Sequence, residues 1–282
     1  MSHLKLLINK EVLMPNKEQP FDRKDFMTNF TDKNYTYESV QTELDETNHS
    51  KVVIKNVKPQ IRKHVPEYAS ELRKRIVEVP EEIYEASGIR VFGHRIKSLL
   101  FSTDVAVIRN SNAQSVIAVY PFTPQLTITQ SIINSSSVPV FTGVGGGTTT
   151  GDRSVNLAFQ SEQAGAFGVV VNSPMANEVI SQIAMVVDVP IIATISSDKD
   201  DFIGKLNAGA NMLNVSGGAH TAEIVKMIRQ KVGDVVPIIA TGGPTGSTIL
   251  ETIHAGANAI TYTPPTSADI FAELMVKYRE NI

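Results

Sequence analysis

Three glycine-rich segments, each lying between an apolar run and a helical pattern, are the parts of this sequence best suited to chemistry. They are 143–151 (GVGGGTTTG), 216–218 (SGG) and 241–246 (TGGPTG). Glycines let neighbouring backbone N–H groups converge on an anion, and the N-terminus of a following helix adds partial positive charge. We therefore expect a small anionic ligand here. The predicted ligand-binding residues are Gly145, Gly146, Gly147, Asn172, Asn214, Ser216, Gly217, Gly218, Thr241, Gly242, Gly243 and Thr263.

Two charged or titratable residues near these segments are candidates for catalysis. His220 follows the second segment and could act as a general acid. Arg109 ends an apolar run and could hold a carboxylate or phosphate through its two-pronged guanidinium. The structural alternatives are a helix-capping histidine and an arginine in a salt bridge, for example with Asp104. Both residues are nevertheless predicted to be catalytic.

Several kinds of site are missing from the sequence. There is no cysteine, so disulfides and thiolate metal sites are excluded. No His, Asp and Glu residues share metal-ligand spacing, so we expect no metal and no cofactor, while Mg²⁺ bound through a substrate phosphate remains open. A P-loop lysine, a dinucleotide-binding fingerprint and a Gly-x-Ser-x-Gly elbow are also missing.

The candidate residues follow short apolar runs that indicate buried parallel strands. Continuous Val and Ile without polar alternation is typical of strands covered on both faces. Eight strands alternating with helices predict a (β/α)8 TIM barrel over 104–282, with an open doubly wound sheet as the alternative. The runs are 105–109, 115–120, 138–142, 167–172, 189–194, 211–215, 236–241 and 259–263, and the helical patterns are 124–134, 152–164, 175–187, 199–208, 220–232, 246–255 and 267–280.

One connection does not fit this pattern. Only residues 110–114 join the first run to the second, which is too short for a crossover helix between parallel strands. Either the N-terminal region supplies the missing helix, or 105–109 is not a barrel strand.

A repeated unit supports the barrel. Val-Pro at 138, 189 and 236 opens a run, and each unit reaches Ala-Gly-Ala, at 164–166, 208–210 and 255–257. A glycine that ends a helix and turns sharply into a buried strand needs positive φ and small neighbours. These turns enter the strands at their amino ends, which is the stability face of a barrel, so chemistry is expected at the opposite face.

Residues 1–103 are predicted to form a separate, partly helical extension. Helices are expected at 66–79 and 89–101, and 33–50 is expected to be a long loop. The apolar faces of the two helices could mediate a homo-oligomer.

Charge and hydropathy narrow the partners and the location. The net charge is −3, and the half from residue 104 onward has more Asp and Glu than Lys and Arg, so nucleic acid is not an expected partner. No apolar run is long enough to span a membrane, and the first residues do not resemble a signal peptide. A cytoplasmic protein is expected.

The segment 236–265 resembles the last two βα units of the phosphate-binding (β/α)8 barrels. The likeness rests on its Val-Pro-Ile-Ile-Ala-Thr-Gly-Gly turn and its Ala-Gly-Ala-Asn-Ala-Ile. This superfamily includes 2-keto-3-deoxy-6-phosphogluconate aldolase, thiazole synthase and the glycerol-operon antiterminator protein, and it implies a phosphate at Gly242, Gly243 and the turn 261–266. Two departures stand out. Pro264 and Pro265 replace the usual glycine, and Asn214 ends the sixth run where an aldolase has its Schiff-base lysine.

These observations lead to three functional hypotheses. The first is a lyase or isomerase that acts, without a Schiff-base lysine, on a small phosphorylated or carboxylated metabolite. The second is a non-catalytic metabolite sensor, which would need backbone donors and few bases. The third, and weakest, is a hydrolase using Ser173 or Ser216, because no base is paired with either serine in the sequence.

Overall fold

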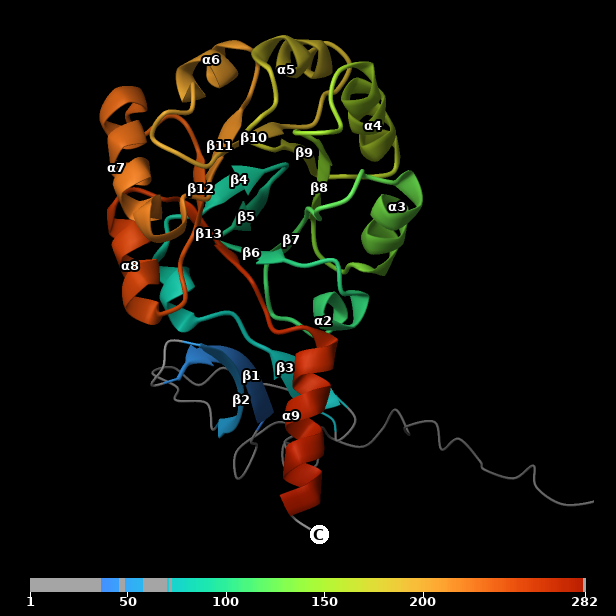
Figure 1. Ribbon diagram of the computed structural model, residues 1–282, viewed down its shortest axis with the longest axis vertical. Helices are drawn as coiled ribbons and strands as arrows, with labels where there is room; N and C mark the ends of the chain where they lie inside the picture. The colour runs from blue at the N-terminus through green and yellow to red at the C-terminus, as the bar shows by residue number, and fades with distance from the viewer. Residues whose placement is uncertain (1–36, 46–48, 58–69, 71–72, 281–282) are drawn as a thin grey trace, which may run out of the picture. The chain divides into compact units, whose positions relative to one another are not determined.

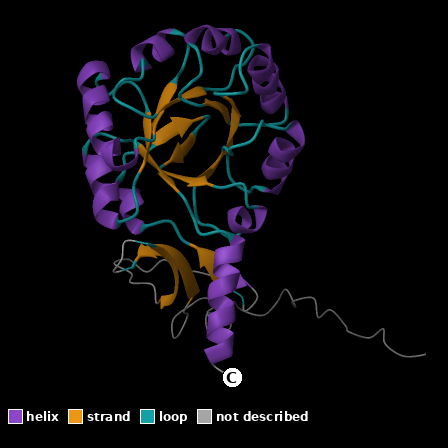
Figure 2. Ribbon diagram, viewed as in Figure 1, coloured by secondary structure: helices purple, strands orange, loops and turns teal. Residues whose placement is uncertain are grey.

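Eight parallel strands close into a barrel in the computed structural model, which describes residues 37–45, 49–57, 70 and 73–280 (Figure 1). The elements below all belong to one compact unit, residues 37–57 and 75–282. The last strand pairs with the first, and Figure 2 shows the resulting ring of strands with helices outside it. The barrel strands are β6 (Ser98–Phe101), β7 (Ser115–Ala118), β8 (Val140–Gly145), β9 (Gly168–Val171), β10 (Ile191–Ile195), β11 (Met212–Val215), β12 (Ile238–Thr241) and β13 (Ala259–Tyr262).

Each strand is followed by a helix, as a (β/α)8 barrel requires. Seven of the eight predicted strands and all seven predicted helices are confirmed, with shifts of a few residues at their ends. The helices are α2 (Val105–Arg109), α3 (Leu126–Ser135), α4 (Asp152–Gln163), α5 (Asn177–Ala184), α6 (Phe202–Asn207), η3 (Gly218–His220) leading into α7 (Thr221–Val232), α8 (Gly246–His254) and α9 (Ser267–Glu280).

The strand predicted at 105–109 is wrong, because these residues form helix α2. The side chain of Asp104 caps this helix, accepting hydrogen bonds from the backbone N–H groups of Ala106 and Val107 at 3.0 and 3.2 Å. The first barrel strand is β6, so the barrel begins at Ser98, before the boundary predicted at residue 104. The short connection 110–114 therefore joins a helix to a strand and needs no crossover.

The helix predicted at 89–101 is also wrong. Residues 89–96 form an antiparallel hairpin of β4 (Ile89–Val91) and β5 (His94–Ile96), and β6 follows. Phe92 and Gly93 have φ of 44° and 84°, as the tightest hairpin turns require. Ile89, Val91 and Ile96 pack against the inward side chains of the barrel strands.

This hairpin closes the amino end of the barrel. It directly precedes β6, and the Phe92 ring meets the ring of Phe167, the residue before β9, edge-on at 5.2 Å. In Figure 1 it lies inside the ring of strands. The opposite, carboxyl end is therefore the end at which a ligand could enter.

A three-stranded sheet precedes the barrel. Strand β1 (Tyr37–Leu44) pairs antiparallel with β2 (Ser50–Val57) and parallel with β3 (Arg75–Val77), and the short helix η2 (Glu81–Glu85) follows. The long loop predicted at 33–50 is therefore wrong where β1 lies.

The helix predicted at 66–79 is wrong where β3 lies, and 66–69 and 71–72 fall outside the described residues. Because 75–77 and 89–101 are strands and turns, the helical faces proposed for a homo-oligomer are not present there, and oligomerisation stays a prediction. No helix in the described part of the chain is long and apolar enough to cross a membrane.

The core has two layers, separated by the barrel wall. Outward side chains such as Val169, Ile191 and Leu213 pack against the helices, and inward ones such as Phe141, Ile192 and Ile239 fill the barrel. The glycines of the three Ala-Gly-Ala turns have φ between 97° and 115°, which confirms their predicted conformation.

Candidate functional site

The carboxyl ends of the barrel strands gather most of the predicted ligand-binding residues on one rim, as the parallel topology dictates. Side chains alternate between the two faces of a strand, and Val170, Ile192 and Met212 point into the barrel. Asn172, Thr194 and Asn214, each two positions further along, therefore also point inward. We call these three the inner polar row.

The inner polar row crosses three neighbouring strands and contains an unsatisfied polar atom. Thr194 pairs directly with Asn214, and the Asn214 Nδ2 group donates to Thr194 Oγ1 at 3.4 Å. Asn214 is 8% exposed, and its Oδ1 atom has no hydrogen-bond partner. A buried amide oxygen without a partner carries a desolvation cost, which a polar ligand would offset.

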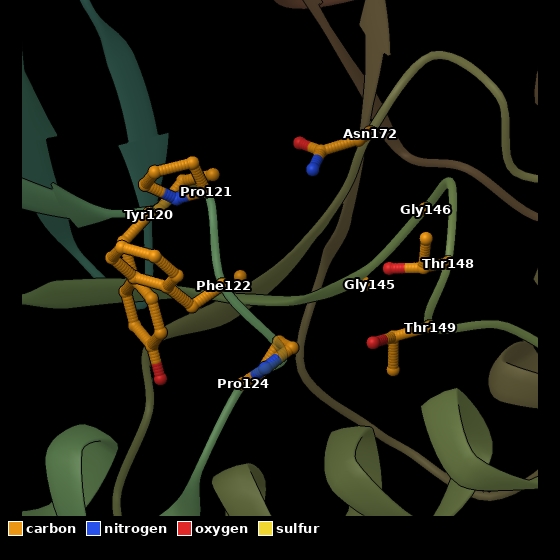
Figure 3. A pocket seen from close by; sticks show the side chains of 11 residues that line it. Tyr120, Pro121, Phe122, Pro124, Gly145, Gly146, Thr148, Thr149 and Asn172 are labelled. Atoms are coloured by element: carbon orange, nitrogen blue, oxygen red, sulfur yellow. The ribbon is translucent and has the colours of Figure 1, made fainter.

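A cavity of about 210 Å³, the mouth pocket, opens at the Asn172 end of this row, and Thr194 and Asn214 do not line it. Figure 3 shows the Asn172 amide pointing into the space between the segment 120–124 and the loop 145–149. The described lining is composed of backbone, hydroxyl, amide, aromatic and proline groups, with no carboxylate and no cation. It consists of Val119, Tyr120, Pro121, Phe122, Pro124, Gly143, Gly145, Gly146, Thr148, Thr149 and Asn172.

The glycines of the mouth pocket are required by its geometry. Gly145, Gly146 and Gly147 have φ of 135°, 121° and 78°, a run that other residues rarely adopt. A β-carbon on Gly146 would lie 2.5 Å from the Asn172 Cβ, and one on Gly145 would lie 2.5 Å from the Thr149 carbonyl oxygen. The Gly146 N–H donates to that carbonyl at 2.8 Å and closes the turn. Only glycine allows the loop to approach Asn172 this closely.

The loop after β12, the seventh strand of the barrel, has a more negative electrostatic environment than the mouth pocket. Gly242 and Gly243 lead to helix α8, whose first turn is capped by Thr245 through reciprocal hydrogen bonds with Thr248. The Glu82 side chain also lies against Gly246, in the space that a β-carbon there would fill. A carboxylate of the chain itself therefore stands at the helix N-terminus where the resemblance placed a phosphate.

A second, larger cavity of about 1060 Å³ adjoins this loop, and we call it the acidic cleft. Thr241, Gly242, Gly243 and Thr263, all predicted ligand-binding residues, line it. Its carboxylates are Glu43, Glu78, Glu81, Glu82 and Asp269, and its described lining includes no Lys, Arg or His. An anion is disfavoured among these carboxylates, so the mouth pocket is the better place for one.

The three predicted ligand-binding residues after β11, Ser216, Gly217 and Gly218, mainly make contacts within the fold. The Ser216 hydroxyl accepts from Thr241 Oγ1 at 3.4 Å, and the Gly217 N–H donates to Thr221 Oγ1 at 3.1 Å. Gly218 has a φ of 61° and begins η3. None of the three lines the mouth pocket or the acidic cleft.

The two predicted catalytic residues lie away from both cavities. Arg109 ends helix α2 rather than a strand, and its Nη1 group donates to the Ser135 carbonyl, at the end of α3, at 3.3 Å. Because these helices run back toward the amino ends of the strands, Arg109 lies on the stability face. The His220 side chain is 75% exposed and pairs with Glu223, with 3.0 Å between Nδ1 and Oε2. The structure brings neither residue to the mouth pocket.

A polar cluster that was not predicted from the sequence joins the loops after β9 and β10 through hydrogen bonds. Asp200 Oδ2 accepts hydrogen bonds from the hydroxyls of Ser173 and Ser196 at 2.9 and 3.1 Å, and from the backbone N–H groups of Ser196 and Ser197. Burial alone would raise the pKa of Asp200, but these hydrogen bonds outweigh it and lower the pKa. Ser173, one of the two serines proposed for a hydrolase, thus donates to a carboxylate that cannot act as a strong base.

Lys205 extends this cluster into the protein. Its side chain is 4% exposed, and its ammonium donates to the carbonyls of Ser173 and Met175, both at 2.9 Å. Burial lowers its pKa, and Asp200 and Asp201 oppose that shift. The sequence does not predict this contact, because the partners of Lys205 are backbone carbonyls of a loop about 30 residues earlier in the chain.

The described residues contain no group of three His, Asp or Glu side chains that could hold a metal ion. The carboxylates that line the acidic cleft therefore do not form such a group.

Comparison with protein-family models found no match, and no curated protein matched the sequence. Solved structures do match. One is 2,3-dimethylmalate lyase, described as a member of the PEP mutase/isocitrate lyase superfamily, with a TM-score of 0.52 and 12% identity over 71% of this chain and 84% of that one. Another is phosphoenolpyruvate phosphomutase from Streptomyces platensis subsp. rosaceus, with a TM-score of 0.50 and 12% identity over 70% and 83% of the two chains.

A third is phosphonopyruvate hydrolase, solved in complex with oxalate and Mg²⁺, with a TM-score of 0.50 and 13% identity over 67% of this chain and 82% of that one. These proteins differ from the aldolase and thiazole synthase group that the sequence resembles. What this chain shares with them is the fold, a (β/α)8 TIM barrel.

Proposed function

We propose that the mouth pocket binds a small phosphorylated or carboxylated metabolite, and that the protein is a lyase or isomerase acting on it. The observation that carries this proposal is the lining itself. Glycine backbone, the Thr148 and Thr149 hydroxyls and the Asn172 amide surround a cavity with no carboxylate among its described lining residues. Such groups hold anionic oxygens without a cation.

The surroundings of the mouth pocket support an anion there. The loop 143–151 leads into helix α4, whose N-terminus adds partial positive charge, although the Asp152 carboxylate in the first turn of this helix offsets part of it. Asn172 is the member of the inner polar row that lines the mouth pocket, and a ligand that reached past it into the barrel could supply the hydrogen-bond partner that Asn214 Oδ1 lacks. A metabolite carrying an anionic group and a hydroxyl or protonated carboxyl would satisfy both.

Proton transfer is assigned to Tyr120 in this proposal. Tyr120 is the one ionisable side chain among the described lining residues of the mouth pocket, and its hydroxyl accepts from the Gln125 N–H at 2.9 Å. A phenol held in this way can donate a proton to a developing oxyanion. Because His220 and Arg109 lie outside the mouth pocket, the proposal does not depend on them.

The fold neighbours suggest which compounds to test first. Phosphonopyruvate, phosphoenolpyruvate, 2,3-dimethylmalate and oxalate are small carboxylates or phosphorylated carboxylates connected with those proteins by name. Binding to the full chain can be measured by calorimetry and turnover by product analysis, each with and without Mg²⁺. The proposal predicts that Asn172→Leu abolishes binding and that Tyr120→Phe lowers turnover at least about 100-fold with affinity changed only a few-fold.

A metabolite sensor is the second candidate, favoured by the scarcity of titratable groups in the mouth pocket. It predicts ligand binding that Asn172→Leu removes, no turnover by the unaltered protein, and no effect of Tyr120→Phe beyond a modest change in affinity. Binding that survives Asn172→Leu would contradict both candidates, because it would place the ligand elsewhere.

A further inference from the structure

A buried lysine, which the proposed function does not use, holds the backbone beside Asn172. Lys205 is 4% exposed, and its ammonium donates hydrogen bonds to the carbonyls of Ser173 and Met175, both at 2.9 Å. Among the described residues, no carboxylate lies within 4.0 Å of this ammonium. A buried charge costs solvation free energy that an apolar side chain at the same position would not cost. A role beyond stability is therefore expected for Lys205.

The two carbonyls that Lys205 contacts belong to one tight turn, residues 172–175. The Met175 N–H group donates to the Asn172 carbonyl at 3.0 Å and closes this turn. On another side of the turn, the Ser173 hydroxyl donates to Asp200 Oδ2 at 2.9 Å. Ser173 is thus held at its carbonyl by Lys205 and at its hydroxyl by Asp200, which leaves the backbone that follows Asn172 little freedom to rotate.

Both ends of this turn contact the glycine-rich loop of the mouth pocket. At the first end, the Asn172 N–H group donates to the Gly145 carbonyl at 2.9 Å, and Figure 3 shows the Asn172 amide pointing into the pocket. At the other end, Met175 is 2% exposed, and the Thr150 hydroxyl donates to its Sδ atom at 3.5 Å. A displacement of the turn would therefore move the Asn172 amide relative to the loop expected to hold the anion.

We propose that Lys205 is a positioning residue of the mouth pocket, whose ammonium holds the 172–175 turn so that the Asn172 amide points at the ligand. Lys205 does not line the mouth pocket, so it acts through Asn172 and not by contact with the ligand. The effect on ligand affinity rests on the proposed function. The orientation of the Asn172 amide does not, and it can be measured without a ligand.

Proton–nitrogen correlation NMR of the full chain measures that orientation. The side-chain amide signals of Asn172 are assigned as the pair that disappears in Asn172→Leu. In Lys205→Met we expect this pair to shift by more than its line width or to broaden, because the turn loses its buried donor. The control is Ile228→Val, which lowers stability by removing a buried methylene from α7, a helix that packs against β11, β12 and α8. It should leave the pair unchanged.

Calorimetry with phosphoenolpyruvate tests the consequence for binding. Affinity should fall at least about tenfold in Lys205→Met and stay unchanged in Ile228→Val, because a small displacement of a binding group weakens its contacts. Chemical rescue separates the charge from packing. The chain has no cysteine of its own, so Lys205→Cys can be alkylated at one place while unfolded and then refolded. Alkylation with 2-bromoethylamine, which restores an ammonium, should recover the amide signals and the affinity, and 1-bromopropane, which adds a neutral chain, should not.

Two results would overturn the inference. The first is an unchanged pair of Asn172 amide signals in folded Lys205→Met. The second is equal recovery of those signals with the propyl and aminoethyl side chains, which would assign the contact to packing alone. A different result would count against the proposed function only. If the Asn172 signals move as expected and the unaltered protein binds none of the anionic compounds named above, the positioning of Asn172 stands and the proposed ligand class does not.

Discussion

Asn172 packs directly on the backbone of Gly146, so closely that a β-carbon at 146 would lie 2.5 Å from the Asn172 Cβ. This contact joins the loop after β8 to the residue after β9 on one side of the mouth pocket.

Gly146→Ala should therefore damage the mouth pocket more than strain alone would. Both Gly146 and Gly147 have positive φ, but no atom lies within 4 Å of a β-carbon at 147. Gly147→Ala is the matched control, expected to cost about 1–2 kcal/mol of unfolding free energy from backbone strain. Gly146→Ala should cost more and also abolish binding of the anionic ligand. Equal losses of stability and binding in the two variants would contradict the contact.

Replacing Asn214 by leucine should separate binding from stability. The unpartnered Oδ1 atom costs about 1–3 kcal/mol in the ligand-free protein, so Asn214→Leu should unfold in denaturant at an unchanged or higher concentration. The same variant should lose affinity for a mouth-pocket ligand. Thr142→Val is the control, because the Thr142 hydroxyl is also buried without a partner but lies on the outward face of β8. It should be neutral or stabilising and bind normally.

The stability of the protein should fall in acid partly through Asp200. Its pKa in the folded state lies below the ordinary value of 3.8, because hydrogen bonds to the carboxylate outweigh its burial. The folded state therefore binds its proton less readily than the unfolded state does. The stabilising contribution is complete above pH 3.8 and is lost as the pH falls through the lower folded pKa.

Denaturant unfolding of Asp200→Asn between pH 7 and pH 2.5 measures this contribution. The variant should be less stable than the unaltered protein at pH 7, and the difference should shrink in acid. Asp198→Asn, at an exposed neighbouring position, is the control and should follow the unaltered protein. A difference that is constant with pH would show that the charge of Asp200 is not involved.

Lys205→Met should destabilise the protein by about 1–3 kcal/mol, despite removing a buried charge. The reason is that the carbonyls of Ser173 and Met175 lose their donor inside the protein. Lys226→Met, an exposed substitution on α7, should stay within about 0.5 kcal/mol of the unaltered protein. A Lys205→Met protein as stable as the control would indicate that water replaces the ammonium.

Most of the fold could be predicted from the sequence because buried parallel strands and their helices have distinct periodicities. The exceptions have physical causes. Residues 105–109 are as apolar as a strand, and only the capping by Asp104 shows that they form a helix. Residues 89–101 show alternation at Ile89 and Val91, but the turn at Phe92 and Gly93 gave a weak signal because phenylalanine rarely has positive φ.

The sequence predicts where on the barrel the site lies, but it does not predict which residues of the site contact one another. The rim position of Gly146 and Asn172 follows from the strand order, while their direct contact depends on packing. The carboxylate of Glu82 beside Gly246 could not be anticipated, because these residues are far apart in the sequence and no local pattern joins them. Because of that contact, the anion is expected at the loop after β8 and not at the loop after β12.

The most direct test of the proposed anion site is a crystal of the full chain soaked in phosphate or phosphoenolpyruvate. The proposal predicts electron density in the mouth pocket, with ligand oxygens within hydrogen-bond distance of the Asn172 amide and the 145–149 loop. Density at the 242–246 turn, beside Glu82, or at neither place when the ligand is shown to bind in solution, would contradict the proposal.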